Sequence, residues 1–203
     1  MLEMLNVLDQ TEYLPAKLPI YVASFSEHPD QLSQWRGYCP RGSGFAVCVS
    51  PDRMMKLAEV RGWELFKCIY QVDHQIEVLR RMEEFAINRF ASDKSVPLPI
   101  VFGLTLLKFS TALKHPKFAE ESEWRAVQRA GGTPLVRAGT STLTPYVNFP
   151  LMIDEKDVVE LSKLVVGPTP HLHLAIRAAR SLRQQHEVTC SEPIASEIPF
   201  RNW

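Results

Sequence analysis

The sequence predicts one α+β domain over residues 1–203, with a mixed, twisted sheet and flanking helices. Three observations lead to this prediction. The chain has 203 residues, of which 45% are hydrophobic, and this is enough for a single packed core. Short apolar runs between turn residues alternate with longer segments whose apolar residues recur at helical spacing. Near the C-terminus a strand, a turn, a helix and a second strand follow one another, which predicts a parallel βαβ unit.

The first predicted elements are a strand over residues 18–26 and a short helix after it. Ser26 is predicted to cap this helix, which carries Trp35 on its last turn. A buried strand is then expected over residues 44–50, because an apolar run lies there between turn residues.

Ser50 and Pro51 predict the start of the next helix, because serine is a preferred N-cap and proline suits the first helical position. This helix is expected to run to about Val60, and residues 63–70 alternate as a strand requires. The middle of the chain is predicted to hold helices over residues 73–91 and 99–113, strands over residues 121–129 and 146–151, and a loop that starts at Gly131.

The C-terminal βαβ unit is predicted from three segments. Residues 164–167 form an apolar strand that ends in glycine, and Thr169 and Pro170 start a helix. Residues 188–190 complete the unit as a second strand. The helix carries an apolar set made up of Leu172, Leu174, Ala175, Ala178, Ala179 and Leu182.

Composition and motifs exclude several classes of protein. The formal net charge is zero, whereas a general nucleic-acid binder would carry a basic excess. The longest apolar run, residues 96–109, is interrupted and too short to span a bilayer of about 30 Å. The N-terminus lacks targeting features and the four cysteines lack paired spacing, so we expect a cytoplasmic protein without a membrane partner. No Walker loop, dinucleotide-binding glycine pattern, HExxH or GxSxG occurs, and no metal site is expected.

The most informative stretch holds Glu121, Glu123 and Arg125. On a strand the two glutamates share one face, where carboxylates repel each other unless a cation or a substrate hydroxyl lies between them. Two interpretations stay open. Either this is a solvated strand end in which Glu123 pairs with Arg125 or Arg36, or a carboxylate holds a ribose hydroxyl and favours an oxocarbenium-like transition state. In both cases we expect at least one of these arginines to pair with a glutamate of residues 120–123.

A second polar cluster lies near the N-terminus. Ser24 and Ser26 either end a strand and cap a helix, or present hydroxyls to a cleft beside the carboxylate, on a strand next to the glutamates. The dipeptides Trp35-Arg36 and Trp124-Arg125 either pack beside surface charges, or offer a ring for stacking and a guanidinium for anion capture. The candidate substrate-binding residues are Ser24, Ser26, Trp35, Arg36 and Arg125.

Five segments form a combined pattern: Ser24-Phe25-Ser26-Glu27, Trp35-Arg36-Gly37-Tyr38, Gly44-Phe45-Ala46-Val47, residues 118–125 and Val165-Val166-Gly167-Pro168. Together they resemble a widespread bacterial family of domains of unknown function, which carries a CFS…W..Y…G block followed by E.EWR. The resemblance covers roughly residue 21 to the end. It implies the fold but no settled activity. The short stretch before the block implies either that part of a site is missing or that this is a shortened version of the domain.

A second resemblance concerns ADP-ribosyltransferases. Ser24-Phe25-Ser26 and Glu121-Ser122-Glu123 are similar, in the same order, to the serine-rich strand and the E-x-E strand that surround NAD in those enzymes. This resemblance implies that Glu123 is the catalytic carboxylate and Glu121 orients the nucleophile, with NAD as the substrate and no metal. The early basic residue of those enzymes has no counterpart, because Lys17 is the only base nearby and Arg36 follows the serines.

Two functions are therefore expected as alternatives. The first is an NAD-using, ADP-ribosyltransferase-like or NAD-cleaving enzyme with a nucleotide ligand, acting in a toxin or phage-defence setting. The second is a non-catalytic binding module, in which Glu, Arg and Trp side chains hold the fold and a partner surface. A pocket beside Glu123 favours the enzyme, and a closed internal pair of Glu123 with Arg125 favours the module.

Overall fold

The computed structural model describes residues 20–201 except 96, 130–132, 140 and 155. The first residues of the predicted strand, the base Lys17 and the loop start at Gly131 lie outside the described residues. Helices and sheets are both present, so the predicted α+β class is confirmed. Backbone contacts divide the chain into two compact units. The expectation that residues 1–203 form a single domain stays a prediction. The first unit is Met1–Phe25 with Glu64–Asn148, and the second unit is Ser26–Trp63 with Phe149–Trp203.

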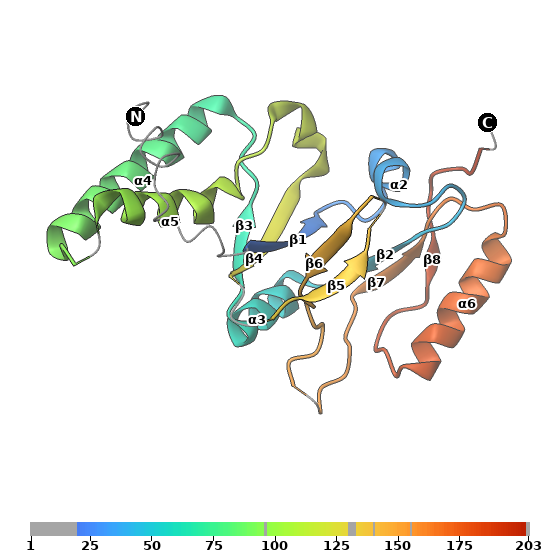
Figure 1. Cartoon of the computed structure of the whole chain (residues 1–203). Helices are drawn as coiled ribbons and strands as arrows, with labels where there is room; N and C mark the ends of the chain where they lie inside the picture. Colours follow the sequence, from blue (N-terminus) through green and yellow to red (C-terminus); the bar gives the residue numbers. More distant parts are fainter. Residues whose placement is uncertain (1–19, 96, 130–132, 140, 155, 202–203) are drawn as a thin grey trace. The chain divides into compact units, whose positions relative to one another are not determined.

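The first unit contains a three-stranded sheet with the order β1-β4-β3 (Figure 1). β3 and β4 are antiparallel, with Leu65 opposite Ala126. Because β4 lies in the centre, Ala126 and Val127 are buried, and this strand can hold polar side chains away from water. The strands are β1 (Ile20–Ser26), β4 (Glu123–Arg129) and β3 (Glu64–Lys67).

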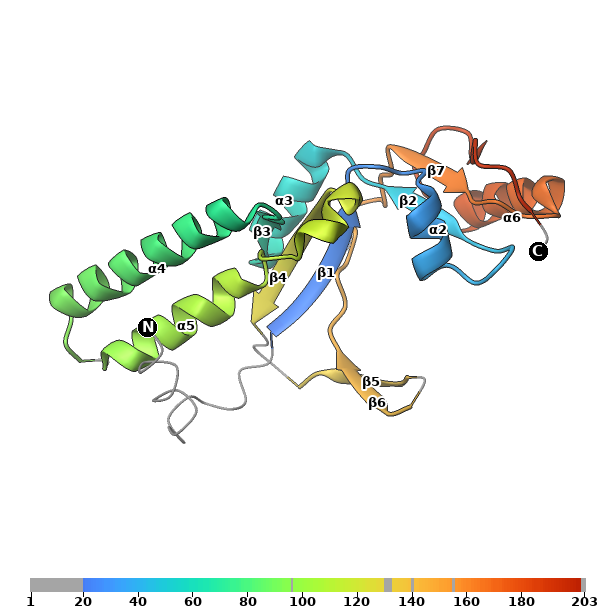
Figure 2. The same cartoon turned by 90° about the horizontal axis from the view of Figure 1, so that it is seen from above.

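Two helices, α4 (Val72–Ser92) and α5 (Leu98–Ser110), lie side by side in the first unit (Figure 2). Their ranges closely match the predicted helices, because both carry apolar residues at helical spacing over several turns. Phe109 of α5 contacts Phe66 of β3 edge-on, with ring centroids 5.6 Å apart, and so anchors the helix to the sheet. A 3₁₀ helix, η1 (Pro116–Glu121), then leads to β4. None of the helices in the described part of the chain is long and apolar enough to cross a membrane.

The second unit contains the predicted C-terminal βαβ unit (Figure 1). β7 (Lys163–Val166) pairs in parallel with β8 (Ile194–Ala195), and α6 (Leu172–Gln185) connects the two strands. On the other side of β7 lies β2 (Phe45–Cys48), which is antiparallel, so the sheet is mixed as predicted. Ala179 of α6 packs against Leu164 and Val166 of β7 and closes the core.

Two further helices of the second unit are α2 (Leu32–Tyr38) and α3 (Pro51–Arg61). At the start of α3 the Ser50 hydroxyl accepts a hydrogen bond from the N–H of Arg53 at 3.2 Å, which confirms the predicted cap. At its end Gly62 has φ 66°, a left-handed conformation that glycine adopts without steric cost.

Two predictions near the N-terminal motifs are wrong. Ser26 does not cap α2, whose N-cap is Gln31. The Ser26 hydroxyl instead accepts from the N–H of His28 at 3.1 Å, because a serine bonds its own turn as readily as a helix end. Glu121 is not part of a strand either, since it ends η1 before β4 begins at Glu123.

Two expected strands are displaced. The strand predicted over residues 146–151 reaches only Tyr146, because the pairing occurs earlier, between β5 (Leu135–Ala138) and β6 (Leu143–Tyr146). The second βαβ strand is β8, whereas residues 188–190 contribute one isolated bridge from Thr189 to Glu160. A short apolar run does not specify its pairing partner, which is set by tertiary position.

Candidate functional site

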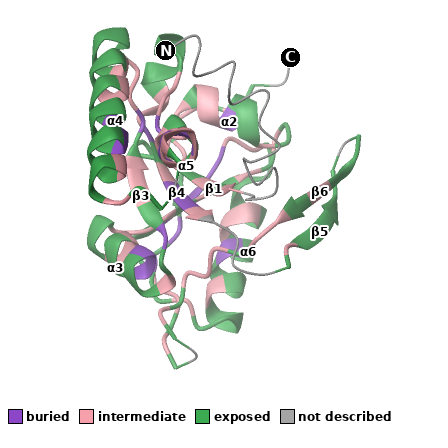
Figure 3. Cartoon of the chain, turned by 60° about the vertical axis from the view of Figure 1, so that its left-hand side comes forward, coloured by how far each residue is buried: buried purple, intermediate pink, exposed green. Residues whose placement is uncertain are grey.

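The candidate site of the first unit is built around Glu123, the first residue of β4. Ser122 before it has φ 42°, so the chain changes direction sharply between η1 and β4. The N–H of Glu123 lies 2.8 Å from Tyr70 Oη, which accepts its hydrogen bond, and the Glu123 carbonyl accepts from the N–H of Cys68 at 2.9 Å. These bonds fix the start of β4, and Figure 3 shows buried segments along this strand. Glu123 is only 5% exposed.

The carboxylate of Glu123 is surrounded by hydrogen-bond donors. Arg125 donates from Nε to Oε1 at 2.9 Å and from Nη2 to Oε2 at 3.2 Å. Lys114 Nζ donates to Oε2, and the Ser24 side chain on β1 supplies a further hydrogen bond. Because a carboxylate has about four acceptor sites, these contacts fill it. We call Ser24, Lys114, Glu121, Glu123 and Arg125 the Glu123 cluster.

Lys114 links the two carboxylates of the cluster. Its Nζ lies 2.5 Å from Oε2 of Glu121 and also bonds Glu123. The Lys114 carbonyl accepts from Gln75 Nε2 of α4 at 2.7 Å, which fixes the segment after α5. Arg125 Nη1 donates in turn to the carbonyl of Thr111. Two carboxylates thus face two cations, and this balance is what allows charges to lie at low exposure.

The contacts shift the pKa values of both charged partners. Burial raises the pKa of Glu123, but hydrogen bonds from Arg125, Lys114 and Ser24 outweigh burial and lower it to about 2. Burial lowers the pKa of Lys114, but hydrogen bonds to Glu121 and Glu123 outweigh burial and raise it well above its ordinary value. At neutral pH Glu123 is an anion and Lys114 a cation. A carboxylate with so low a pKa is a weak base, which disfavours general acid–base chemistry.

The neighbouring thiol of Cys68 and hydroxyl of Tyr70 are protonated at neutral pH. Burial raises the pKa of the Cys68 thiol to about 11, and it raises the pKa of Tyr70 as well. Neither side chain is therefore an activated nucleophile. Among the described residues, no group of three His, Cys, Asp or Glu side chains is placed to hold a metal ion.

The structure brings together several of the predicted site residues. Ser24 lies on β1, next to the strand of Glu123, as predicted, and Arg125 is the predicted arginine partner. The prediction that Glu121 and Glu123 share one face of a strand is wrong. The left-handed conformation of Ser122 interrupts the alternation of side chains between the two glutamates. Lys114 was not among the site residues predicted from the sequence, because no motif around it indicates a role in a site. The only signal is the general need for a cation between two carboxylates.

Trp35 and Arg36 belong to the second unit and are described there by themselves. Trp35 is buried, and its indole Nε1–H donates to Asp30 Oδ1 at 2.7 Å. Asp30 also accepts from Ser196 Oγ at 2.5 Å. Burial raises the pKa of Asp30, but the hydrogen bonds from Ser196 and Trp35 outweigh burial and lower it. The aspartate therefore joins α2 to the segment after β8.

Two glycines leave room beside this tryptophan. A Cβ atom on Gly167 would lie 2.8 Å from Cζ3 of Trp35, and a Cβ atom on Gly44 would lie 2.5 Å from Cys39 Sγ. The ring thus packs against backbone, while Arg36 is exposed. We call Asp30, Trp35, Gly44, Gly167 and Ser196 the Trp35 cluster. Substrate binding stays a prediction for all five candidate residues, which are Ser24, Ser26, Trp35, Arg36 and Arg125.

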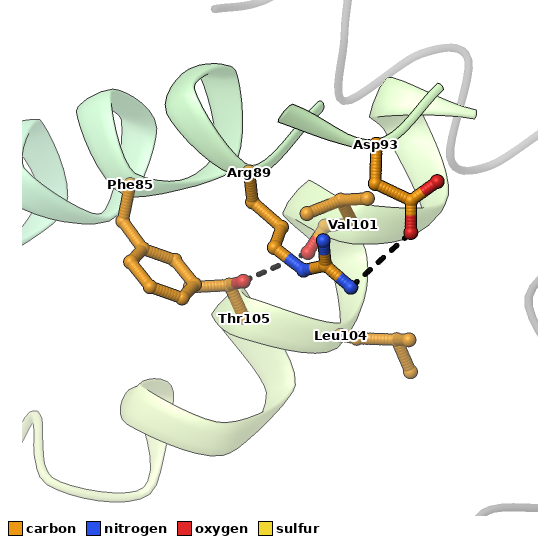
Figure 4. Close-up of a pocket in the computed structure, with 6 residues that line it drawn as sticks. All are labelled: Phe85, Arg89, Asp93, Val101, Leu104 and Thr105. Carbon is orange, nitrogen blue, oxygen red and sulfur yellow. Dashed lines mark hydrogen bonds and ion pairs between the residues drawn. The ribbon is translucent and has the colours of Figure 1, made fainter. Parts of the chain in front are cut away.

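A cavity of about 220 Å³ lies between α4 and α5 (Figure 4). Arg89 and Asp93 form an ion pair at 3.4 Å there, and the Thr105 hydroxyl donates to the carbonyl of Val101 at 2.8 Å. None of its lining residues belongs to the Glu123 cluster. They are Phe85, Arg89, Asp93, Val101, Leu104 and Thr105.

Residues 34–126 match the family described as "Protein of unknown function (DUF2971)". The matched region contains Trp35 and Gly44 as well as Glu121, Glu123 and Arg125. The resemblance to a family of domains of unknown function is therefore confirmed, whereas the resemblance to ADP-ribosyltransferases is not. No curated protein and no solved structure matches the chain.

Proposed function

We propose that this chain is a non-catalytic binding module in which the Glu123 cluster holds the fold of the first unit. The observation that carries this proposal is the saturation of the Glu123 carboxylate by Arg125, Lys114 and Ser24. A catalytic carboxylate needs an acceptor site for a substrate hydroxyl, and a filled one offers none. A buried ion-pair network of this kind is costly to break, so it suits a structural role.

A second candidate is an NAD-using enzyme related to ADP-ribosyltransferases. The hydrogen bond from Ser24, on a neighbouring strand, to Glu123 favours it. Ser24 is exposed, so a ribose hydroxyl could replace its hydroxyl on the carboxylate. Glu123 would then stabilise the positive charge that develops on the ribose as nicotinamide leaves with the bonding electrons. A role in phage defence belongs to this candidate, whereas a cytoplasmic setting is proposed for both candidates.

An assay of nicotinamide release from NAD by the purified chain distinguishes the binding module from the NAD-using enzyme. The binding module predicts no release by wild type and no NAD-induced rise in melting temperature. It also predicts that Glu123→Gln lowers stability, because the amide has no negative charge and its NH2 group would face a cationic donor in place of an acceptor oxygen.

The enzyme predicts the opposite pattern. Wild type releases nicotinamide, Glu123→Gln abolishes release with an unchanged melting temperature, and Glu121→Gln retains simple NAD cleavage. Release by wild type that Glu123→Gln removes would overturn the binding module.

A further inference from the structure

Helix α6 carries two apolar stripes, and its own unit uses only one of them. Ala175, Ile176 and Ala179 pack against β7 and close the core of the second unit. Leu174 and Leu182 are 57% and 55% exposed, and Ala178 between them is exposed as well. The sequence pattern groups both stripes in one apolar set, but the sheet covers only the inner one.

The exposed stripe has the geometry of a helix-packing ridge. Leu174, Ala178 and Leu182 are spaced by four residues, and such rows form the ridges that interdigitate when two helices pack. The small side chain of Ala178 leaves a gap between two leucines, into which a residue of another helix fits. We call these three residues the α6 ridge.

The charged residues of α6 itself all have one sign. Residues 172–185 contain Arg177, Arg180 and Arg183 and no aspartate or glutamate. Glu192 pairs with Arg180 and lies 3.6 Å from Arg183. Arg177 forms no ion pair within the described part of the chain, and it lies on the exposed side of α6. A partner that covers the ridge therefore meets an uncompensated cation, which favours an acidic partner.

Resting on the proposed function as a binding module, we propose that the α6 ridge docks an acidic amphipathic helix of a partner protein. An anionic membrane surface fits less well, because interfacial helices bury a broad apolar face, whereas the inner stripe of α6 is already packed against the sheet. A second copy of this chain would place Arg177 near its own counterpart across a two-fold axis. A helix with leucines four residues apart and glutamates beside them matches both the ridge and the charge.

The test uses a designed peptide of about 18 residues, long enough for five turns, with leucines four apart and flanking glutamates. Its binding to the full chain is measured by fluorescence anisotropy, beside a peptide with lysines in place of the glutamates. We expect wild type to bind the acidic peptide and not the basic one. Leu174→Gln and Leu182→Gln should each weaken binding at least about tenfold, as loss of a central anchor does.

Two further variants complete the design. Arg177→Glu should weaken binding of the acidic peptide and create binding of the basic peptide. Met55→Gln is the matched control, since Met55 of α3 is also 57% exposed, and it should leave binding unchanged. The four changed side chains are all exposed, so we expect the variants to have the melting temperature of wild type. Equal melting temperatures show that the fold is kept.

Three results would overturn the docking surface. They are no binding of the acidic peptide by wild type, ridge variants that bind as well as wild type, and ridge-dependent binding to anionic phospholipid vesicles without binding to the peptide. Each of these leaves the nicotinamide assay unaffected. Failure of the α6 ridge is therefore distinguishable from failure of the binding module, which only nicotinamide release decides.

Discussion

The two Trp–Arg dipeptides of this chain are buried in opposite ways. In the second unit Trp35 is 9% exposed and Arg36 lies in solvent. In the first unit Trp124 is 36% exposed, and the guanidinium of Arg125 is directed to Glu123 and to the carbonyl of Thr111. The same pair of residue types therefore serves a packing role in one unit and an electrostatic role in the other.

The difference follows from the element that carries each pair and from the partners it meets. On β4, neighbours point to opposite faces, so Arg125 shares a face with Glu123 while Trp124 does not. On α2, Trp35 faces the core, and Asp30 accepts the hydrogen bond of its indole. In each unit the less exposed member has a polar partner, because a donor that is removed from water without an acceptor destabilises the fold.

The largest expected effect is the loss of the buried tryptophan. Trp35→Ala should lower the free energy of unfolding by about 3–5 kcal/mol, since it leaves a cavity beside Gly167 and removes the indole hydrogen bond to Asp30. Trp124→Ala is the matched control and should cost about 1 kcal/mol or less, because its ring is partly in solvent. Urea unfolding measures both. Equal losses for the two tryptophans would contradict the comparison.

The loss of the partly buried Arg125 should come next. Arg125→Met is expected to lower the free energy of unfolding by about 3 kcal/mol, because Glu123 then stays buried with fewer partners. Arg36→Met should change it by less than about 0.5 kcal/mol, since Arg36 is exposed. Thermal and urea melts compare the pair. An unchanged unfolding midpoint for Arg125→Met would contradict the electrostatic role of Arg125.

A smaller effect is expected at the glycine beside Trp35. Gly167→Ala should destabilise the fold by about 2 kcal/mol, because its Cβ would lie 2.8 Å from the ring of Trp35. Gly37→Ala has the opposite expected sign. Its Cβ meets nothing within 4 Å and it lies in α2, so it should stabilise the fold by about 0.5–1 kcal/mol. Calorimetry on both variants checks the two signs, and a neutral Gly167→Ala would show that the ring has room to move.

A further expected effect is a change in how steeply stability falls with pH. The pKa of Glu123 is about 2 in the folded chain against an ordinary value of 4.5. A depressed carboxyl pKa contributes stability that is fully present above pH 4.5 and is lost as pH falls toward 2. The urea midpoint of Glu123→Gln should therefore fall less steeply below pH 4.5 than that of wild type. Parallel curves for the two proteins would show that Glu123 is not the titrating group.

Local signals determined much of the fold from the sequence alone. Ser50 and Pro51 start α3, and Gly62 ends it, because caps and left-handed glycines act within a few residues. The periodic helices α4, α5 and α6 follow from patterns that run over several turns, whereas the second strand of the βαβ unit lies later than the sequence predicted. For the candidate site, the sequence indicated that Glu123 needs an arginine and that the serine strand lies beside it.

Only the tertiary structure decided which partners meet. Lys114 joins Glu121 to Glu123, and Asp30 binds Ser196, which is 166 residues away along the chain. The pairing of β5 with β6 and the exposure of Leu174 on α6 were decided in the same way. The physical reason is that hydrogen-bonding caps and periodicity act locally, whereas burial and charge compensation depend on side chains that folding brings together from distant parts of the sequence.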